Sequence, residues 1–245
     1  MTGWRPVLLL IVAGLFLVPA GVQAQDLSIS LGEDGSLSAR TIQLFALITV
    51  LSLAPGLAIM ITCFPFMVTV LAILRQAIGL QQSPPNMLIV SLALFMTYFV
   101  MEPVFTAAWE NGIRPLTTEE IDAETAFERA IDPFRGFMAG RLDPDTFLAL
   151  AELRPDTRAA TPTAEAPLSL LVPSFLLSEI SRAFQIGFLV FLPFLIIDLV
   201  VAAILMSMGM MMVPPAIVSL PFKLAFFVVA DGWSLIAGSL VRSYF

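Results

Sequence analysis

Five ionisable side chains lie in or beside apolar stretches of this sequence, where a charge is costly. Asp198, Lys223 and Asp231 interrupt two such stretches, and Glu179 and Arg182 precede one of them, three residues apart. Each charge in a membrane costs about 2.5–3.5 kcal/mol on insertion scales, so each needs a reason. One reason is a relay of protons or ions through a helix bundle. The other, which we favour, is structural pairing between helices or between subunits, because the acids and cations nearly balance.

A run of three methionines, Met210, Met211 and Met212, is the second unusual feature. Gly209 precedes the run and a Pro-Pro pair follows Val213, so the pattern predicts a loop or a sharp bend. Flexible thioether side chains at a bend could close an apolar constriction. Methionine is also an ordinary membrane residue, and 12 occur in the chain, so both interpretations stay open from the residues alone.

The 245-residue chain contains no histidine and only one cysteine, Cys63. These counts exclude Ser-His-Asp and Cys-His catalysis, histidine-ligated metals and intramolecular disulfides. The nucleophile-elbow, zinc-protease and phosphate-loop motifs are all missing. A net charge of −7 with 12 basic residues does not suit a nucleic-acid binder. We therefore expect no enzyme activity, no cofactor, no metal and no nucleic-acid partner.

The composition predicts an all-α membrane protein. Apolar residues make up 58% of the chain, against about 45–50% in a typical soluble domain, and charged residues only 13%. Four apolar stretches have helix length and show no strand-like alternation. They are Thr41–Leu74, Asn86–Met101, Ile186–Val213 and Ala216–Val241.

Prolines interrupt these stretches. We expect the first to break at Pro55-Gly56 and at Pro65, and the second to close at Glu102-Pro103, with Val104–Trp109 as a weaker continuation. Broken helices at membrane depth need neighbouring protein to satisfy their free backbone groups, which favours an oligomer.

The N-terminus has the pattern of a secretory signal peptide, residues 1–24. Arg5 supplies the positive charge, Val7–Val18 the apolar core, and small residues favour cleavage between Ala24 and Gln25. An uncleaved anchor is the alternative. Residues 25–40 then form a short exported segment, followed by a first helical hairpin over residues 41–108.

An acidic insertion, residues 109–170, separates this hairpin from a second one, residues 171–245. From Glu102 to Glu165 the chain has 13 acidic and 6 basic residues. The loop before the second apolar stretch carries Arg75 and no acid, so the positive-inside rule places the insertion in the periplasm.

The insertion itself is predicted to be helical, with Pro133 splitting its first helix, a second helix starting at Asp143-Pro144-Asp145, and a linker over Ala159–Pro167. The expected apolar face of the first helix comprises Ile121, Phe127, Ile131, Phe134 and Phe137.

A series of short motifs lies in or beside the apolar stretches. They are LRQAIG (Leu74–Gly79), PPN (Pro84–Asn86), MEPV (Met101–Val104), SEI (Ser178–Ile180), AFQIGF (Ala183–Phe188), PFLIIDLV (Pro193–Val200), GMMMVPP (Gly209–Pro215), LPFKL (Leu220–Leu224) and DGW (Asp231–Trp233). Together these motifs resemble the FliP family of flagellar type III export-gate subunits. The resemblance covers about residues 45–108 and 170–243.

The resemblance implies a subunit of a right-handed helical ring built with FliQ and FliR and with further membrane subunits of the export apparatus, in the flagellar basal body. Such a ring passes unfolded flagellar proteins across the inner membrane. By the same comparison, Met210, Met211 and Met212 form a gasket around the closed pore, and Glu179, Lys223 and Asp231 pair between subunits.

Two alternatives accompany this interpretation. One is the homologous gate subunit of a virulence injectisome, which typically lacks the signal peptide and the Val-Pro-Pro after the methionines. The other is an ion channel or secondary transporter that uses Asp198 and Asp231. The sequence also departs from the family at Pro65-Phe66, where a Thr-Arg pair is common, so any pairing built on that arginine is in doubt.

Overall fold

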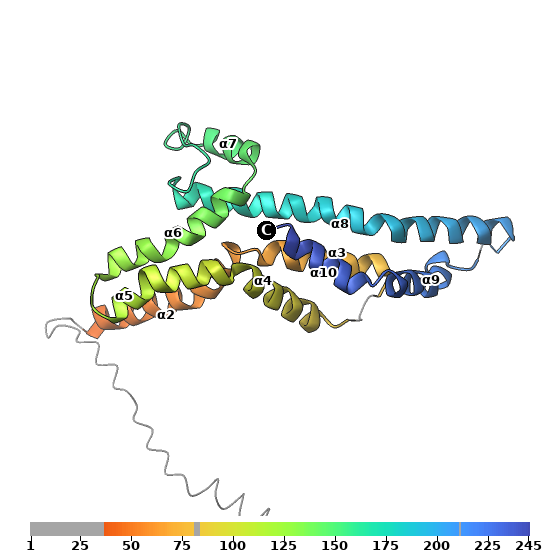
Figure 1. The fold of residues 1–245 in the computed structure, drawn as a ribbon, viewed down its shortest axis with the longest axis horizontal. Helices are drawn as coiled ribbons and strands as arrows, with labels where there is room; N and C mark the ends of the chain where they lie inside the picture. The colour runs from red at the N-terminus through yellow and green to blue at the C-terminus, as the bar shows by residue number, and fades with distance from the viewer. Residues whose placement is uncertain (1–36, 81–83, 211) are drawn as a thin grey trace, which may run out of the picture. The chain divides into compact units, whose positions relative to one another are not determined.

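The computed structural model describes residues 37–80, 84–210 and 212–245, and within these ranges every regular element is a helix (Figure 1). The all-α prediction is therefore confirmed. The predicted signal peptide, with its expected cleavage between Ala24 and Gln25, lies outside the described residues. The elements are α2 (Leu37–Met60), α3 (Phe64–Ile78), α4 (Asn86–Ala108), the π-helical η1 (Trp109–Ile113), α5 (Arg114–Thr117), α6 (Ala123–Arg141), α7 (Pro144–Glu152), α8 (Leu168–Ser207), α9 (Pro215–Val229) and α10 (Gly232–Arg242).

The chain divides into two compact units, Met1–Val50 and Leu51–Phe245. In the first unit, the described residues form the first part of α2. All the packing considered below lies within the second unit.

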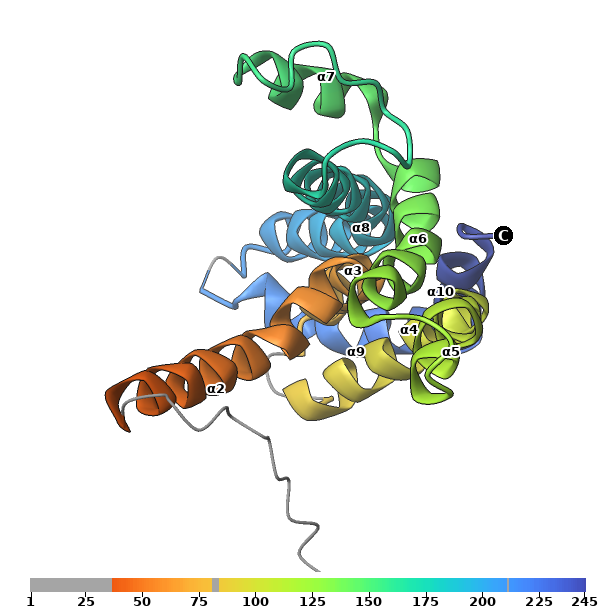
Figure 2. The same cartoon turned by 90° about the vertical axis from the view of Figure 1, so that its left-hand side faces the viewer.

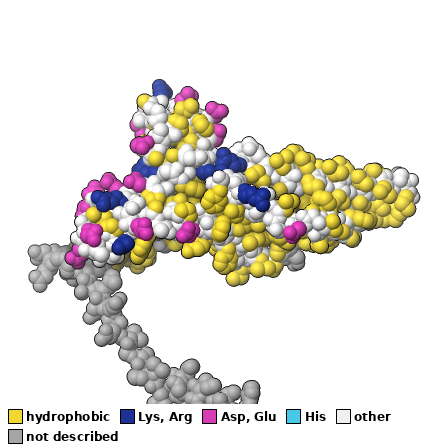
Figure 3. All heavy atoms as spheres, viewed as in Figure 1, with side chains coloured by type: hydrophobic (Ala, Val, Ile, Leu, Met, Phe, Trp, Pro, Cys, Tyr) yellow, Lys and Arg dark blue, Asp and Glu magenta, His cyan; other side chains and the backbone are white. Residues whose placement is uncertain are grey.

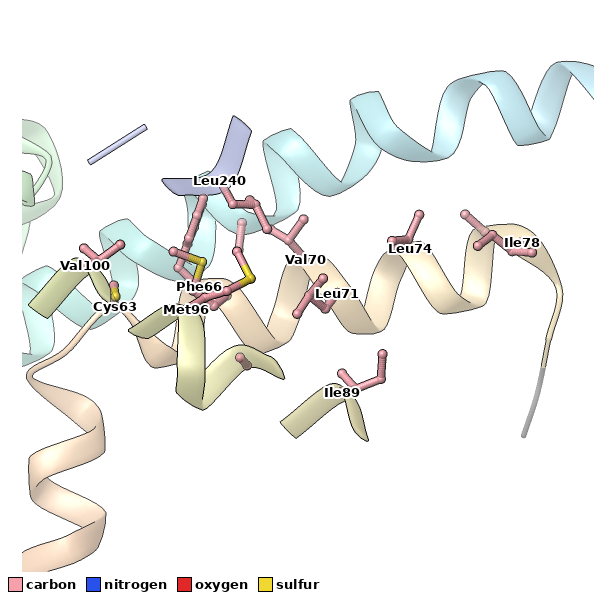
Figure 4. Close-up of a cluster of buried hydrophobic side chains, with 14 of the residues drawn as sticks. Cys63, Phe66, Val70, Leu71, Leu74, Ile78, Ile89, Met96, Val100 and Leu240 are labelled. Carbon is pink, nitrogen blue, oxygen red and sulfur yellow. The ribbon is translucent and has the colours of Figure 1, made fainter. Parts of the chain in front are cut away.

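Helix α3 is the centre of the second unit, where it packs against α8 and α4. Pro65 lies in the first turn of α3, where its missing N–H costs nothing, and Gly79 ends the helix at a φ of 89°. Gly187 of α8 permits close packing, because a Cβ there would come within 2.4 Å of Ile73 Cδ1. Figure 4 shows the buried core, whose labelled residues are Cys63, Phe66, Val70, Leu71, Leu74, Ile78, Ile89, Met96, Val100 and Leu240.

The prolines break fewer helices than expected. The first apolar stretch does break just before Pro65, between Met60 and Phe64, but Pro55 lies inside α2. Pro103 lies inside α4, so the predicted closure at Glu102-Pro103 is wrong. An interior proline costs about 3 kcal/mol, which the burial of an apolar helix can offset.

The acidic insertion begins as a continuation of α4 through η1 and α5, and α6 then packs back on η1 and α4. Pro133 lies inside α6, so the predicted split of this helix is wrong. Phe127, expected on the apolar face, is 63% exposed, and Ala126 and Met138 are the buried residues of α6. Acidic side chains gather over the insertion (Figure 3).

Gly112 lets η1 approach the backbone of α6. A Cβ at this position would lie 2.6 Å from the Ala126 carbonyl oxygen and 2.7 Å from the Ala130 amide nitrogen. We expect Gly112→Ala to destabilise the insertion by about 1–3 kcal/mol, as overpacking against backbone does, and to lower the thermal unfolding midpoint. Gly136→Ala is the matched control: its Cβ meets nothing within 4 Å, so the substitution should be neutral or stabilising by up to about 1 kcal/mol. Equal midpoints for both variants would contradict the prediction.

The second helix of the insertion, α7, starts where the sequence predicts. Asp143 caps it, because its Oδ2 accepts hydrogen bonds from the Thr146 backbone N–H (2.9 Å) and hydroxyl (2.7 Å). Both bonds lower the pKa of the Asp143 carboxyl, and the bond from the Thr146 hydroxyl has the larger effect. Irregular chain then leads from Leu153 to Pro167, which includes the predicted linker.

Helix α8 continues for 40 residues from Leu168, so the predicted boundary between insertion and second hairpin falls in its first turn. Pro173 and Pro193 lie inside it. Figure 2 shows α8 end-on beside α3 and α6, both of which it contacts. Helices α9 and α10 form a bent pair with an angle of 61°.

Several helices are suited to a membrane. By length and composition, three helical segments of the described residues could each cross a bilayer, and the bent pair of α9 and α10 could form a fourth span. The three segments are Thr41–Met60, Asn86–Thr117 and Leu168–Ser207. The surface at the α8–α9 end is mostly hydrophobic in Figure 3. These features confirm the prediction of a membrane protein.

Candidate functional site

The methionine run lies at the turn between α8 and α9. Gly209 adopts a φ of 75°, which other residues rarely accept, and the Met210 N–H bonds to the Leu205 carbonyl at 2.9 Å. Proline then occupies the first position of α9, where no N–H is needed. The predicted loop is therefore present, although Met211 itself lies outside the described residues.

The described methionine side chains of this turn are exposed and not part of the packed core. Met212 is 97% exposed, Met208 67% and Met210 42%. Three thioethers on one exposed turn leave flexible apolar surface available to another chain or to a passing polymer.

A buried polar cluster joins α8, α9 and the C-terminal end of α3. Lys223 Nζ donates to Asp198 Oδ2 at 2.6 Å and to the Ala77 carbonyl at 3.1 Å. The Ser219 hydroxyl donates to Asp198 Oδ1 at 2.5 Å. The Lys223 side chain is 7% exposed and that of Asp198 33%. Because these two side chains form an ion pair, each of the two charges has its counter-charge within the same chain.

A second cluster surrounds Glu179, which is fully buried in α8. Arg141, the last residue of α6, donates from Nε to Glu179 Oε1 at 3.2 Å. Arg182 Nη1 lies 3.6 Å from the same oxygen, at the three-residue spacing seen in the sequence. Tyr244 donates its hydroxyl to the other carboxylate oxygen. Sequence reasoning missed Arg141 and Tyr244, because only the fold brings them to Glu179.

Asp231 joins neither cluster. It is exposed, with a φ of 46°, and it precedes α10 at the bend after α9 without capping that helix through its side chain. Of the five predicted charges, the structure thus brings Glu179 to Arg182 and Asp198 to Lys223, and leaves Asp231 apart. Pairing between subunits stays a prediction for all five.

Phe66, where the resembling family commonly has arginine, is fully buried. Its ring meets the Tyr244 ring edge-on, with centroids 5.5 Å apart. An aromatic contact therefore occupies the place where the resembling family commonly has a cation. Among the residues that the structure describes, no three His, Cys, Asp or Glu side chains come together as a metal site.

Comparison with known proteins gives a consistent result. Residues 47–240 match the FliP family. The flagellar biosynthetic protein FliP of Caulobacter vibrioides is 52% identical over 93% of this chain and 86% of its own length. Its counterpart in Agrobacterium fabrum is 47% identical over 96% and 98% of the two chains, and that of Bacillus subtilis 43% identical over 83% and 92%.

Proposed function

Because this chain belongs to the FliP family, we propose that it is a core subunit of the flagellar type III protein-export gate. In this role it forms, with FliQ, FliR and further export-apparatus subunits, the pore that passes unfolded flagellar proteins across the inner membrane. The role is one of conduction and not catalysis. The driving energy therefore comes from another component.

The exposed methionine turn is the observation that carries the proposal. Met210 and Met212 are presented at the tip of an apolar helical hairpin and away from the core of their own chain. Repeated around a ring, with Met211 between them, they would line a narrow apolar constriction. Thioethers can close such a constriction against ions and still yield to chains of varied sequence.

The proposed assembly also suits the apolar surface of α8 and α9. Large exposed side chains such as Phe188, Leu199 and Phe222 need cover from lipid or from other subunits. Pro193 lies inside α8 and has no N–H to donate to the preceding turn. Membrane helices tolerate such a proline where neighbouring helices satisfy the freed backbone group. We infer from this a homo-oligomer within a hetero-complex.

The proposed location is the inner membrane at the flagellar basal body, with the acidic insertion in the periplasm. Arg75 lies in the last turn of α3, and the short loop that follows this helix has no acid, whereas the insertion is strongly acidic. The positive-inside rule favours this orientation.

A clean deletion of the gene tests the proposal. We expect hook and filament proteins to disappear from the culture medium on immunoblots and to return on complementation. If they persist while another secreted protein disappears, the chain serves a virulence-type or second export system. If no secreted protein changes in a strain without a second flagellar set, the proposed function is wrong.

A further inference from the structure

Tyr244, two residues after α10, contacts residues of three other helices, α3, α6 and α8. Its ring lies edge-on to Phe66 of α3 and stacks on Phe137 of α6, with centroids 6.0 Å apart in the second pair. The Arg141 guanidinium lies 4.0 Å from the centre of the same ring. A cation over an aromatic face is attracted by the ring electrons, and the attraction is stronger when water is excluded.

Polar bonds join the same segments. The Tyr244 hydroxyl donates to Glu179 Oε2, and Arg141 Nη1 donates to the Ser243 carbonyl at 2.7 Å. Because Arg141 also donates to Glu179 Oε1, one guanidinium connects the end of α6, the first third of α8 and the segment after α10. We call these four residues, Arg141, Glu179, Ser243 and Tyr244, the α6–α8 clasp.

Because Glu179 is buried, its carboxylate depends on the donors of the clasp. Glu179 is fully buried, and a buried carboxylate is tolerated only when donors surround it. The pKa of the Tyr244 hydroxyl is raised, mainly by burial and to a lesser extent by the adjacent Glu179 charge. The hydroxyl therefore keeps its proton and stays a donor at ordinary pH. Losing one donor leaves the others to hold the charge alone.

The junction between α6 and α7 lies next to the clasp. The Leu142 N–H bonds to the Met138 carbonyl at 2.9 Å, and the Asp143 N–H bonds to the Ser178 hydroxyl at 2.8 Å. Both amides follow Arg141 directly, and Ser178 precedes Glu179. The bond from Asp143 to Ser178, which holds this junction on α8, therefore depends on where the clasp places Arg141 and Glu179.

We infer that Ser243 and Tyr244, the residues after α10, lock the acidic insertion onto α8 through Arg141 and Glu179. The clasp thereby sets the orientation of the insertion on the rest of the second unit. This inference uses contacts within one chain and is independent of the export function proposed above.

Amide hydrogen exchange of the full chain in detergent tests the clasp. Tyr244→Phe removes the hydroxyl and keeps the ring, and Arg141→Lys keeps the charge and removes the bond geometry of the guanidinium. A hydrogen bond to a charged group contributes about 1.5–3 kcal/mol, so we expect each variant to speed exchange across residues 138–147 on the order of tenfold or more. Exchange in α9 should be unchanged. Tyr98→Phe is the matched control, because it removes the only other tyrosine hydroxyl, from a side chain that is 63% exposed.

Each outcome decides the question. Faster exchange confined to the junction in both variants, with Tyr98→Phe unchanged, supports the clasp. Wild-type exchange in both variants overturns it. Faster exchange throughout α8 and α9 also overturns it, because Tyr244 would then stabilise these helices as a whole and not specifically the junction between α6 and α7.

Discussion

Replacing Met210, Met211 and Met212 together with alanine will raise the ion conductance of the assembled complex several-fold and leave its assembly intact. Alanine lacks the long flexible thioether side chain, so a ring of such turns would leave an open water-filled path. The folded subunit should tolerate the change, because Met210 and Met212 contribute exposed surface and not core. Conductance of the purified complex in planar bilayers measures the effect.

Met87→Ala is the control for this experiment. Met87 is also exposed, at 81%, but it lies at the start of α4, far along the chain from the turn. It should leave conductance unchanged. A triple variant that assembles normally and conducts like the wild type would remove the gasket assignment.

Asp198→Asn is expected to destabilise the subunit more than Lys223→Met. The first substitution leaves a nearly buried ammonium group without its counter-charge beside the Ala77 carbonyl, whereas the second leaves a carboxylate that is one-third exposed and bonded to Ser219. Breaking a buried ion pair costs about 3–5 kcal/mol, and we expect Asp198→Asn to fall in that range. Thermal unfolding in detergent and the amount of protein on immunoblots measure both variants.

The double variant Asp198→Asn/Lys223→Met separates structure from transport. If the pair is structural, the double variant recovers stability relative to Asp198→Asn, because no buried charge is left uncompensated. If Asp198 carries ions or protons in a transporter, Asp198→Asn abolishes transport in a stable protein and the second substitution does not restore it. A destabilisation by Lys223→Met that exceeds that of Asp198→Asn would contradict the asymmetry argued here.

The helices were predictable because their signals are local. Apolar runs mark α4 and α8, and Asp143 followed by proline marks the start of α7. Proline effects were not predictable in the same way. Pro103 and Pro133 are tolerated because the helices around them are held by packing against other elements, which a single stretch of sequence does not reveal.

The polar clusters were predictable only in part. The spacing of Glu179 and Arg182 is a local signal, and the structure places them 3.6 Å apart. Arg141 lies 38 residues before Glu179, and Tyr244 lies 65 residues after it, so their meeting depends on how α6 and α10 pack. Composition could show that Asp198 and Lys223 needed partners, but either another helix or another subunit would have met that need.

The buried thiol at the start of α3 has a practical consequence for chemical probing. Cys63 is the only cysteine in the chain and is fully covered, and burial raises the pKa of its thiol to about 12. Cys63 will therefore not react with thiolate-directed reagents near neutral pH. The native cysteine therefore need not be removed before labelling. A cysteine introduced at Met212 or Phe127 would be the single reactive position for a fluorophore, a spin label or a crosslinker.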